Sequence, residues 1–138
     1  MPGHWLLKSE PSAYSFDRLV AEGKTRWDGV RNFTARNHLR EMAEGDTCLF
    51  YHSGDGKDVV GVARVLRTAF PDPTAPGEDW SAVEIAPVKP FPRPVTLAEM
   101  KADKDLTELP MLRLSRLSVS PVGADQFRRI LKLGKCTL

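Results

Sequence analysis

The sequence has few cysteines and no long apolar run. Its two cysteines, Cys48 and Cys136, are too few for a disulfide framework in 138 residues, and they lack the spacing of metal ligands. No apolar segment approaches the length of a membrane span, and no signal peptide precedes the first charged residues. We therefore expect a cytoplasmic protein that does not cross a membrane.

The chain also lacks a large excess of charge of either sign, because the formal net charge is only +2. The molecule as a whole is therefore not a strongly basic nucleic-acid binder. The basic residues are nevertheless clustered: four arginines and one aspartate lie between Arg26 and Arg40, and six basic residues and one acid lie from Arg113 onward. These clusters indicate a basic face beside a pocket, although an ordinary solvated face produces the same pattern.

The residues that are present favour one α+β domain over residues 1–138. The length allows a sizeable core, and hydrophobic (41%) and charged (28%) fractions are ordinary for a globular protein. Apolar periodicity and capping residues predict strands over 4–8, 46–53, 59–70, 80–88 and 117–122, and helices over 16–22, 35–42 and 124–133, with a short one after the capping box at 96–99. Short helices without regular alternation with strands favour a curved sheet or a small barrel.

Small residues within the predicted strand over 59–70 indicate close packing. Gly61 and Ala63 leave room for another group to approach the backbone. Cys48 lies within an apolar run and is expected to be a small buried hydrophobe.

The segment Trp27–Asn32 carries the clearest functional pattern. It combines a tryptophan, an acid, a glycine, an arginine and an amide in six consecutive residues. A buried strand would leave so many polar groups without partners, and an exposed loop rarely contains a tryptophan. An indole offers a stacking face, and carboxylate and amide groups can read a hydrogen-bonding edge. We therefore predict a loop that forms the wall of a polar, aromatic pocket.

Three further segments have an apolar body with polar or basic residues at or beside one end: 5–11, 50–53 and 115–121. We expect all four segments to converge on one site. Structural roles remain open for individual residues: Trp27 as core, His52 as a structural histidine, and Lys8 as a solvated charge. Arg116 and Ser118 are expected on one face of a strand, with Leu117 and Val119 in the core on the other.

Several motifs occur in a fixed order along the chain: Trp5–Pro11, Trp27–Asn32, Ala35–Asn37, Gly45–Asp46, Phe50–Ser53, Pro71–Asp72 and Arg116–Val119. In this order they resemble the EVE domain family, from Trp5 to about Leu133. The resemblance implies a PUA-like fold, a small mixed β-barrel with flanking short helices, related in architecture to YTH domains. It also implies a binding module rather than an enzyme, without a cofactor, that reads modified bases, chiefly modified cytosines in DNA.

The residue patterns and the resemblance together predict two sets of site residues. The first set is expected to contact the ligand and comprises Lys8, Ser9, Trp27, Asp28, Asn32, Tyr51, His52, Ser53, Arg116 and Ser118. The second set, Arg31 and Arg36, is expected to contact the nucleic-acid backbone unless these arginines form only surface ion pairs. The effector that would act on the result is not indicated.

Three alternative functions remain. An RNA reader would use the same pocket, since nothing in the sequence tests for a ribose hydroxyl. A sensor of a free nucleoside or an anionic metabolite would not need the arginines. An enzyme based on Ser9, His52 and Asp28, or on Cys48 and His52, is disfavoured because no nucleophile elbow is present. The three histidines show no metal-ligand spacing.

Overall fold

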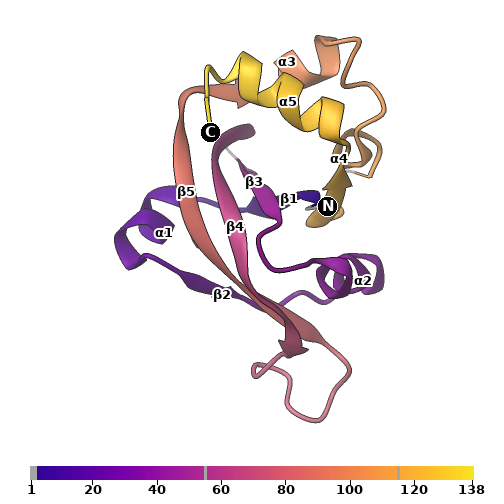
Figure 1. Cartoon of the computed structure of the whole chain (residues 1–138). Helices are drawn as coiled ribbons and strands as arrows, with labels where there is room; N and C mark the ends of the chain where they lie inside the picture. Colours follow the sequence, from indigo (N-terminus) through magenta and orange to yellow (C-terminus); the bar gives the residue numbers. More distant parts are fainter. Residues whose placement is uncertain (1–2, 55, 115) are drawn as a thin grey trace.

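The structure, a computed structural model, describes residues 3–54, 56–114 and 116–138. Six strands form one sheet in the order β2-β5-β4-β3-β1-β6. The strands are β1 (His4–Ser9), β2 (Thr25–Trp27), β3 (Thr47–His52), β4 (Asp58–Pro71), β5 (Ser81–Thr96) and β6 (Val119–Val122). Figure 1 shows β4 and β5 as long, curved strands that run the length of the molecule.

The sheet is mixed and open. Strands β1 and β3 pair in parallel, and all other neighbouring strands pair antiparallel. Strands β2 and β6 are its two edges, and no pairing within the described residues joins them. The predicted α+β class is confirmed, whereas closure of the sheet into a barrel is not confirmed.

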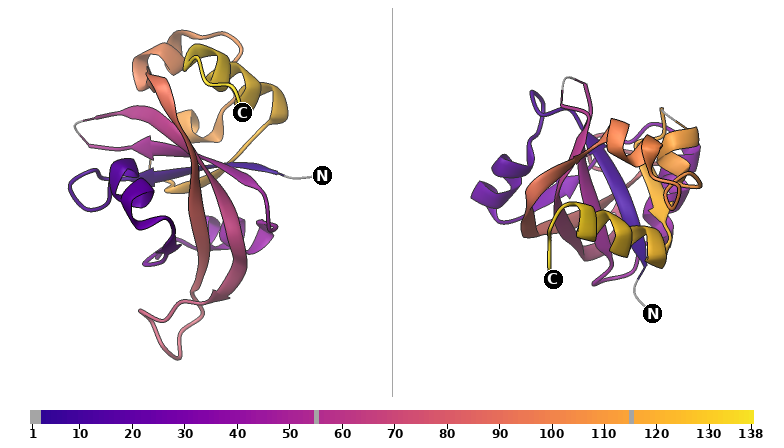
Figure 2. Two further views of the ribbon diagram at one scale, coloured as in Figure 1. Left: turned by 60° about the vertical axis from the view of Figure 1, so that its left-hand side comes forward. Right: turned by 90° about the horizontal axis from the view of Figure 1, so that it is seen from above.

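The described part of the chain has five helices around the sheet: α1 (Phe16–Glu22), α2 (Phe33–Glu41), α3 (Leu97–Ala102), α4 (Pro110–Arg113) and α5 (Ala124–Leu133). The predicted helix over 16–22 is confirmed: the side chain of Ser15 caps α1, and Gly23 ends it in the left-handed conformation. The capping box of Thr96 and Glu99 and the closing helix α5 are also confirmed. In Figure 2 these later helices gather at one end of the sheet.

Some predicted elements differ from the structure. Trp27 ends a short strand rather than lying in a loop, and α2 begins two residues earlier than expected because Asn32 caps it. Helix α4 was not predicted, and β6 begins at Val119, so Arg116 and Ser118 precede the strand instead of sharing one of its faces. The composition of residues 53–57 predicts a hairpin turn. Asp55 of this turn and Ser115 of the polar segment 115–121 lie outside the described residues.

Strand β5 extends eight residues beyond its predicted end, through three prolines. Proline lacks an N–H and is tolerated where one side of a strand is unpaired. Within the described residues, β2 pairs only with Val83–Ile85, so the later part of β5 has one free edge. Its register with β4 also shifts near Pro87 and Pro90. An edge position and bulges therefore explain how this strand holds its prolines.

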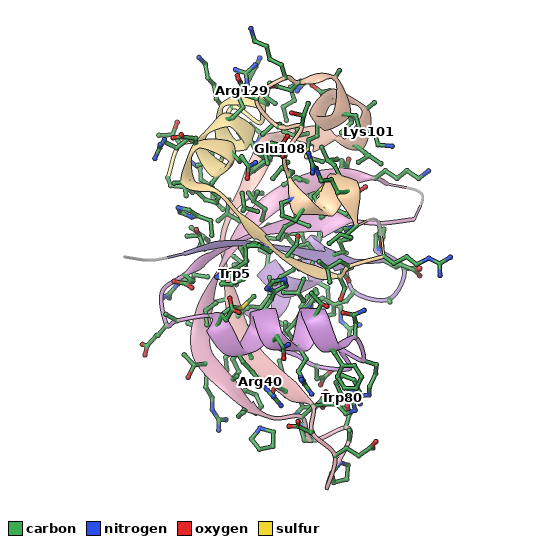
Figure 3. All side chains as sticks on the ribbon, turned by 90° about the vertical axis from the view of Figure 1, so that its right-hand side faces the viewer. Trp5, Arg40, Trp80, Lys101, Glu108 and Arg129 are labelled. Atoms are coloured by element: carbon green, nitrogen blue, oxygen red, sulfur yellow. The ribbon has the colours of Figure 1, made fainter. Side chains whose placement is uncertain are left out.

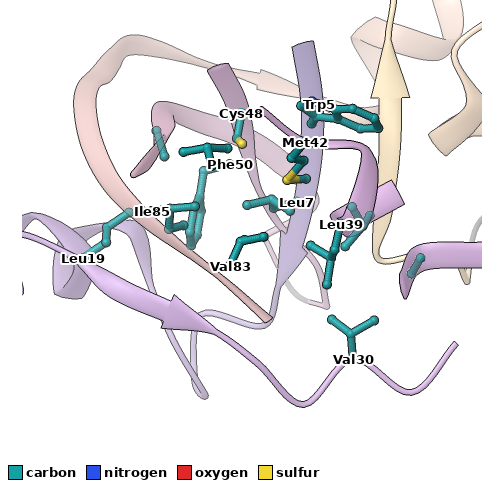
Figure 4. Packing of buried hydrophobic residues seen from close by; sticks show 14 of the residues in the cluster. Trp5, Leu7, Leu19, Val30, Leu39, Met42, Cys48, Phe50, Val83 and Ile85 are labelled. Atoms are coloured by element: carbon teal, nitrogen blue, oxygen red, sulfur yellow. The ribbon is translucent and has the colours of Figure 1, made fainter. Parts of the chain in front are cut away.

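The hydrophobic core has two parts. One contains Trp5, Leu7, Leu39 and Phe50 among its members and is shown in Figure 4. The other contains Leu6, Leu49 and Tyr51 and packs against residues of α3, α4 and α5. Neighbouring residues of β1 and β3 thus alternate between the two clusters, as expected for a sheet covered on both faces. Cys48 is fully buried in the first cluster, as predicted.

Gly61 allows the ring of Phe16 to pack closely against the backbone of β4, as the absence of a side chain predicted. A Cβ atom at this position would lie 2.5 Å from Cζ of Phe16. The first residue of α1 therefore rests directly on the backbone of β4. This contact holds α1 against the sheet beside the site described below.

No helix within the described residues is both long enough and apolar enough to span a membrane. The expected cytoplasmic location stays a prediction.

Candidate ligand-binding site

A cavity of about 630 Å³ lies where the end of β1, helix α1, strand β2 and the segment before β6 meet. This volume is in the range of small-ligand sites. We call it the recognition cavity. Its described lining is Lys8, Ser9, Glu10, Ala13, Tyr14, Arg18, Glu22, Thr25, Arg26, Trp27, Asp28, Gly29, Val30, Arg31 and Ser118.

Trp27 forms an aromatic wall of this cavity, and its ring is held from behind. The indole is half-buried and meets the ring of Phe50 edge-on, with centroids 5.6 Å apart and an interplanar angle of 83°. Phe50 in turn contacts Phe16 edge-on, at 5.4 Å. Because edge-to-face packing fixes the angle between rings, the core orients the indole before any ligand arrives.

Asp72 holds the loop that follows Trp27. Its carboxylate accepts hydrogen bonds from the Gly29 N–H (2.8 Å), from Arg31 (3.0 Å) and from the N–H (2.8 Å) and hydroxyl (2.6 Å) of Thr74. Burial by itself raises the pKa of Asp72, but these hydrogen bonds outweigh it and hold the pKa well below its usual range. Asp72 is therefore an ionised, buried brace for this wall.

Tyr14 and Glu22 form a hydrogen-bonded side of the cavity. The Tyr14 hydroxyl donates to Glu22 at 2.6 Å, and Arg18 pairs with the same carboxylate at 3.4 Å. Burial and the bond to Glu22 raise the pKa of Tyr14, while the same bond lowers the pKa of Glu22. Asp28 accepts from Arg26 at 2.7 Å. The cavity thus has hydrogen-bonding groups of both kinds around one aromatic face.

The end of β1 contributes Lys8 and Ser9. The Ser9 hydroxyl donates to the Tyr14 carbonyl at 2.6 Å, which leaves its oxygen lone pairs as acceptors. The Lys8 backbone N–H donates to the Ser118 carbonyl at 2.9 Å, so the segment before β6 is joined to β1 here. The Lys8 ammonium lies 5.8 Å from the centre of the Tyr51 ring, and burial lowers its pKa.

Half of the predicted residues line the recognition cavity: Lys8, Ser9, Trp27, Asp28, Arg31 and Ser118. Arg31 was expected to contact the nucleic-acid backbone, but its guanidinium binds Asp72 and Thr74. It therefore braces the loop rather than leaving its donors to solvent. The ligand contacts of these residues stay a prediction.

The segment Phe50–Ser53 lies behind the cavity and does not line it. Tyr51 is buried in the second core cluster, on the opposite face of the sheet from Phe50. His52 accepts the Phe16 N–H through Nε2 at 3.1 Å, and burial lowers its pKa. The N–H of Ser53 donates to the Ser9 carbonyl at 2.9 Å. These three residues do not line the recognition cavity, because strand alternation and hydrogen bonds to the backbone give them structural positions. Their ligand contacts stay a prediction.

Asn32, Arg36 and Arg116 also lie outside the recognition cavity. The Asn32 side chain accepts the Ala35 N–H at 2.9 Å as the cap of α2, and Asn32 and Arg116 line a second, neighbouring cavity. Arg36 pairs with Asp79 at 3.2 Å and lies over the ring of Phe33. The four predicted segments therefore do not converge on a single pocket.

The sequence analysis did not predict that α1 and the residues just before it contribute to the recognition cavity. Tyr14, Arg18 and Glu22 line the cavity and are spaced by four residues. Arg18 and Glu22 lie on one face of α1, and Tyr14 lies two residues before the helix begins; the regular spacing was the signal that could have identified them. Thr25 and Arg26, on β2, also line the cavity. No sequence pattern identified them, because their position depends on the pairing of β2 with β5.

Two residues of α2, Phe33 and Arg40, and Trp80 line neither of these two cavities. The rings of Phe33 and Trp80 stack at 5.1 Å with an interplanar angle of 17°, although Phe33 is 66% exposed. Figure 3 shows Trp80 and Arg40 near the tip of the long β4–β5 hairpin, close to α2. Trp5, in contrast, is buried and donates to Asp46 at 2.9 Å, so it belongs to the core.

The described residues contain no group of three or more histidine, cysteine, aspartate or glutamate side chains that could hold a metal ion. Burial raises the pKa of the Cys48 thiol far above its usual value. The thiol is therefore not a reactive thiolate, and the discounted Cys48–His52 pair gains no support.

Comparisons with known proteins identify relatives of the whole chain. The EVE domain family profile matches residues 3–133. Human thymocyte nuclear protein 1 is 32% identical over an alignment that covers 96% of this chain and 74% of the human protein. A crystal structure from Agrobacterium tumefaciens has a TM-score of 0.95 with 39% identity and covers 97% of this chain and 94% of that one.

Two complexes with nucleic acid have similar folds. Human THYN1 in complex with 5-methylcytosine-containing DNA has a TM-score of 0.90 with 30% identity, over 99% of both chains. The YTH domain of a Zygosaccharomyces rouxii protein, in complex with N6-methyladenosine RNA, has a TM-score of 0.59 with 19% identity, over 99% of this chain and 89% of that one. The second similarity shows the fold alone.

Proposed function

This chain belongs to the EVE domain family, and on that premise we propose that it is a non-catalytic module that binds a modified base, a modified cytosine of DNA, in the recognition cavity. The observation that carries the proposal is Trp27, a half-buried indole fixed by Phe50 and surrounded by polar side chains in a cavity of about 630 Å³. We also propose that residues 1–138 form a single such domain.

The nearest functional support comes from a relative. A protein of similar fold and 30% identity, human THYN1, forms a complex with DNA that contains 5-methylcytosine. The cavity described here has the features that such a ligand needs, since a planar base needs one aromatic face and a rim of donors and acceptors. The brace at Asp72 and the aromatic contacts behind Trp27 hold both features in place without a ligand.

The energetics favour a flipped base. Removing a base from the duplex costs a few kcal/mol, and stacking on an aromatic ring returns roughly 1–3 kcal/mol. Hydrogen bonds to the base edge then decide which base is accepted. Ser9, Asp28 and Ser118 are candidates, because each lines the cavity and carries an acceptor.

Discrimination between a methylated and an unmodified cytosine should be modest. A buried methyl group contributes about 0.8 kcal/mol, which corresponds to about a fourfold preference. The described lining holds four basic and three acidic side chains, so the cavity itself is close to neutral. Much of the affinity must therefore come from phosphate contacts outside it, and binding should weaken as salt rises.

Binding to a panel of short labelled oligonucleotides tests the proposal. The panel carries unmodified, methylated, hydroxymethylated and formylated bases in matched DNA and RNA, at near-physiological salt. We expect the wild-type protein to prefer a modified cytosine in DNA. Trp27→Ala should weaken binding of that oligonucleotide about tenfold to hundredfold and abolish the preference, because the stacking face is lost.

Trp80→Ala is the matched control, since it removes a tryptophan that does not line the recognition cavity. Trp27→Phe should restore part of the affinity. Equal affinity for every member of the panel, or an unchanged preference in Trp27→Ala, would refute the proposal. Preference for the RNA members would favour an RNA reader, and binding of free nucleosides alone would favour a small-molecule sensor.

A further inference from the structure

A second cavity, of about 360 Å³, lies beside the recognition cavity. Its described lining is Asn32, Thr34, Arg113, Leu114, Arg116 and Leu117. It is formed by the beginning of α2 and by described residues at and just after the end of α4. We call it the arginine cavity.

The arginine cavity differs from its neighbours in charge. The recognition cavity contains Glu10, Glu22 and Asp28 together with its basic residues, and a third cavity near the β4–β5 tip contains Glu78 and Asp79. Among the described residues that line the arginine cavity, two are arginines and none is acidic. A concave surface with positive charge alone is suited to an anion.

The two arginines of this cavity are weakly held. Arg113 pairs with Glu108 at 2.7 Å, but the two side chains are 62% and 72% exposed, so the pair contributes little. Glu108 lies beside α4, as Figure 3 shows. Arg116 forms no ion pair with any residue that the structure describes. Its guanidinium therefore keeps its fork of donors for a ligand.

The remaining lining suits a nucleotide rather than a bare inorganic anion. Asn32 uses its oxygen to cap α2, which leaves the amide nitrogen as a donor, and Thr34 adds a hydroxyl. Leu114, 53% exposed, and Leu117 give the cavity an apolar part. A phosphate attached to a sugar would use both the donors and the apolar surface.

The arginine cavity continues directly from the recognition cavity along two chain segments. Arg31 lines the first cavity and Asn32 the second, while Ser118 lines the first and Leu117 the second. Neighbouring Cα atoms are about 3.8 Å apart. In both segments, therefore, the residue that lines one cavity is directly followed or preceded by a residue that lines the other. A strand whose base occupies one cavity has its next backbone group close to the other.

We propose that the arginine cavity binds a backbone phosphate of the nucleotide next to the recognised base, with Arg116 as its principal contact and Arg113 as a second. This inference rests on the proposed function and adds the path of the strand to it. It also assigns phosphate binding to arginines other than Arg31 and Arg36, whose guanidinium groups are bound to Asp72 and Asp79.

A chemical double-mutant cycle tests the assignment. Wild-type protein and Arg116→Ala are titrated with single-stranded DNA pentanucleotides that carry a central 5-methylcytosine, with one flanking phosphate replaced by a neutral methylphosphonate. At one of the two flanking positions, the replacement should weaken binding to the wild-type protein about tenfold, because a charge-assisted hydrogen bond is lost. The same replacement should change binding to Arg116→Ala less than about twofold.

Arg128→Ala is the matched control, since it also removes one exposed arginine but lies on α5, outside both cavities. It should retain the full effect of the methylphosphonate. An undiminished effect in both Arg116→Ala and Arg113→Ala would overturn the phosphate assignment.

Comparison with the unmethylated pentanucleotide separates this inference from the proposed function. Arg116→Ala should keep the wild-type ratio of affinities for methylated and unmethylated DNA, because it does not touch the base. If the wild-type protein shows no such preference but the phosphate effect still depends on Arg116, the modified-base proposal fails and the phosphate site stands. Failure of the wild-type protein to bind any oligonucleotide would overturn both.

Discussion

The two neighbouring cavities differ in what surrounds their arginines. In the recognition cavity Arg18, Arg26 and Arg31 each pair with a carboxylate. In the arginine cavity, Arg116 has no such partner among the described residues and Arg113 has only an exposed one. An arginine cluster in sequence therefore contains two kinds of residue, those that brace the protein and those that remain for a ligand, and only the neighbouring acids distinguish them.

The difference also separates two tasks of a reader domain. A braced, nearly neutral pocket can select a base by shape and hydrogen bonds, whereas a cationic neighbour supplies affinity that is independent of sequence. Substitutions in the first cavity should therefore alter selectivity and stability, whereas substitutions in the second should alter affinity and its salt dependence without changing selectivity.

Asp72→Asn should have the largest effect, since it breaks the brace of the recognition cavity. The variant loses a buried carboxylate that accepts from Gly29, Arg31 and Thr74. We expect the free energy of unfolding to fall by about 2–4 kcal/mol, measured by urea denaturation at pH 7. Asp79→Asn, which alters an exposed carboxylate paired with arginines, should change it by less than about 1 kcal/mol.

Acid should reduce the difference between wild type and Asp72→Asn. The pKa of Asp72 in the folded state lies below its value of about 3.9 in the unfolded chain. Its contribution to stability is therefore present above about pH 4 and is lost as the pH falls below that value. An undiminished difference well below pH 4 would contradict the carboxylate's role as an ionised brace.

Gly61→Ala should disturb the aromatic floor of the recognition cavity and leave the arginine cavity intact. The added methyl group would lie within 3 Å of the Phe16 ring, which contacts Phe50 beneath Trp27. We expect a loss of about 1–3 kcal/mol in thermal or urea unfolding. In a Phe16→Leu background the same substitution should cost less, and equal costs in the two backgrounds would argue against the steric explanation.

Arg116→Ala and Arg31→Ala sharpen the comparison of the two cavities directly. Arg116→Ala should reduce the slope of log affinity against log salt by about 0.7 for single-stranded DNA, with stability changed by less than about 0.5 kcal/mol. Arg31→Ala should instead lower stability by about 1–2 kcal/mol, because Asp72 loses a partner. The reverse pattern in titrations at several salt concentrations would refute the division of roles.

The smallest expected effect concerns His52 and pH. Its Nε2 accepts the Phe16 N–H, which only the neutral ring can do, and burial lowers its pKa. The stability from this neutral histidine is therefore present above about pH 6.5, the value in the unfolded chain, and is lost as the pH falls. His52→Gln should flatten this dependence between pH 7 and 5 in urea unfolding, and an equally steep dependence in the variant would point to His4 instead.

Local rules predicted much of the fold. The Ser15 cap, the Thr96–Glu99 capping box and the closing helix over 124–133 depend on residues within one turn of each other. Strand β5 was predicted too short, because its prolines are compatible with a strand only at an edge, and the edge depends on where β2 pairs. The barrel expected from the family resemblance was not confirmed, since the pairing of described residues leaves β2 and β6 as edges.

The candidate site was predicted in part for the same reason. Trp27 and the end of β1 were identified from composition, because an aromatic residue among polar ones is unusual in either core or solvent. Tyr51 was predicted to contact the ligand, whereas the alternation of β3 places it in the second core cluster, opposite Phe50. Asp72 was noticed as part of a motif, but no local pattern revealed that it binds a loop more than forty residues away.

The sequence alone determined which segments become helices and strands, which residues are apolar enough for the core, and where an aromatic residue with polar neighbours lies. These properties depend on periodicity and capping over a few residues. The tertiary structure decided which arginines find acids, that the polar segments divide between two cavities, and that Asp72 holds the wall of one of them. Such contacts join residues distant in sequence, so their energies are set only when the sheet brings the segments together.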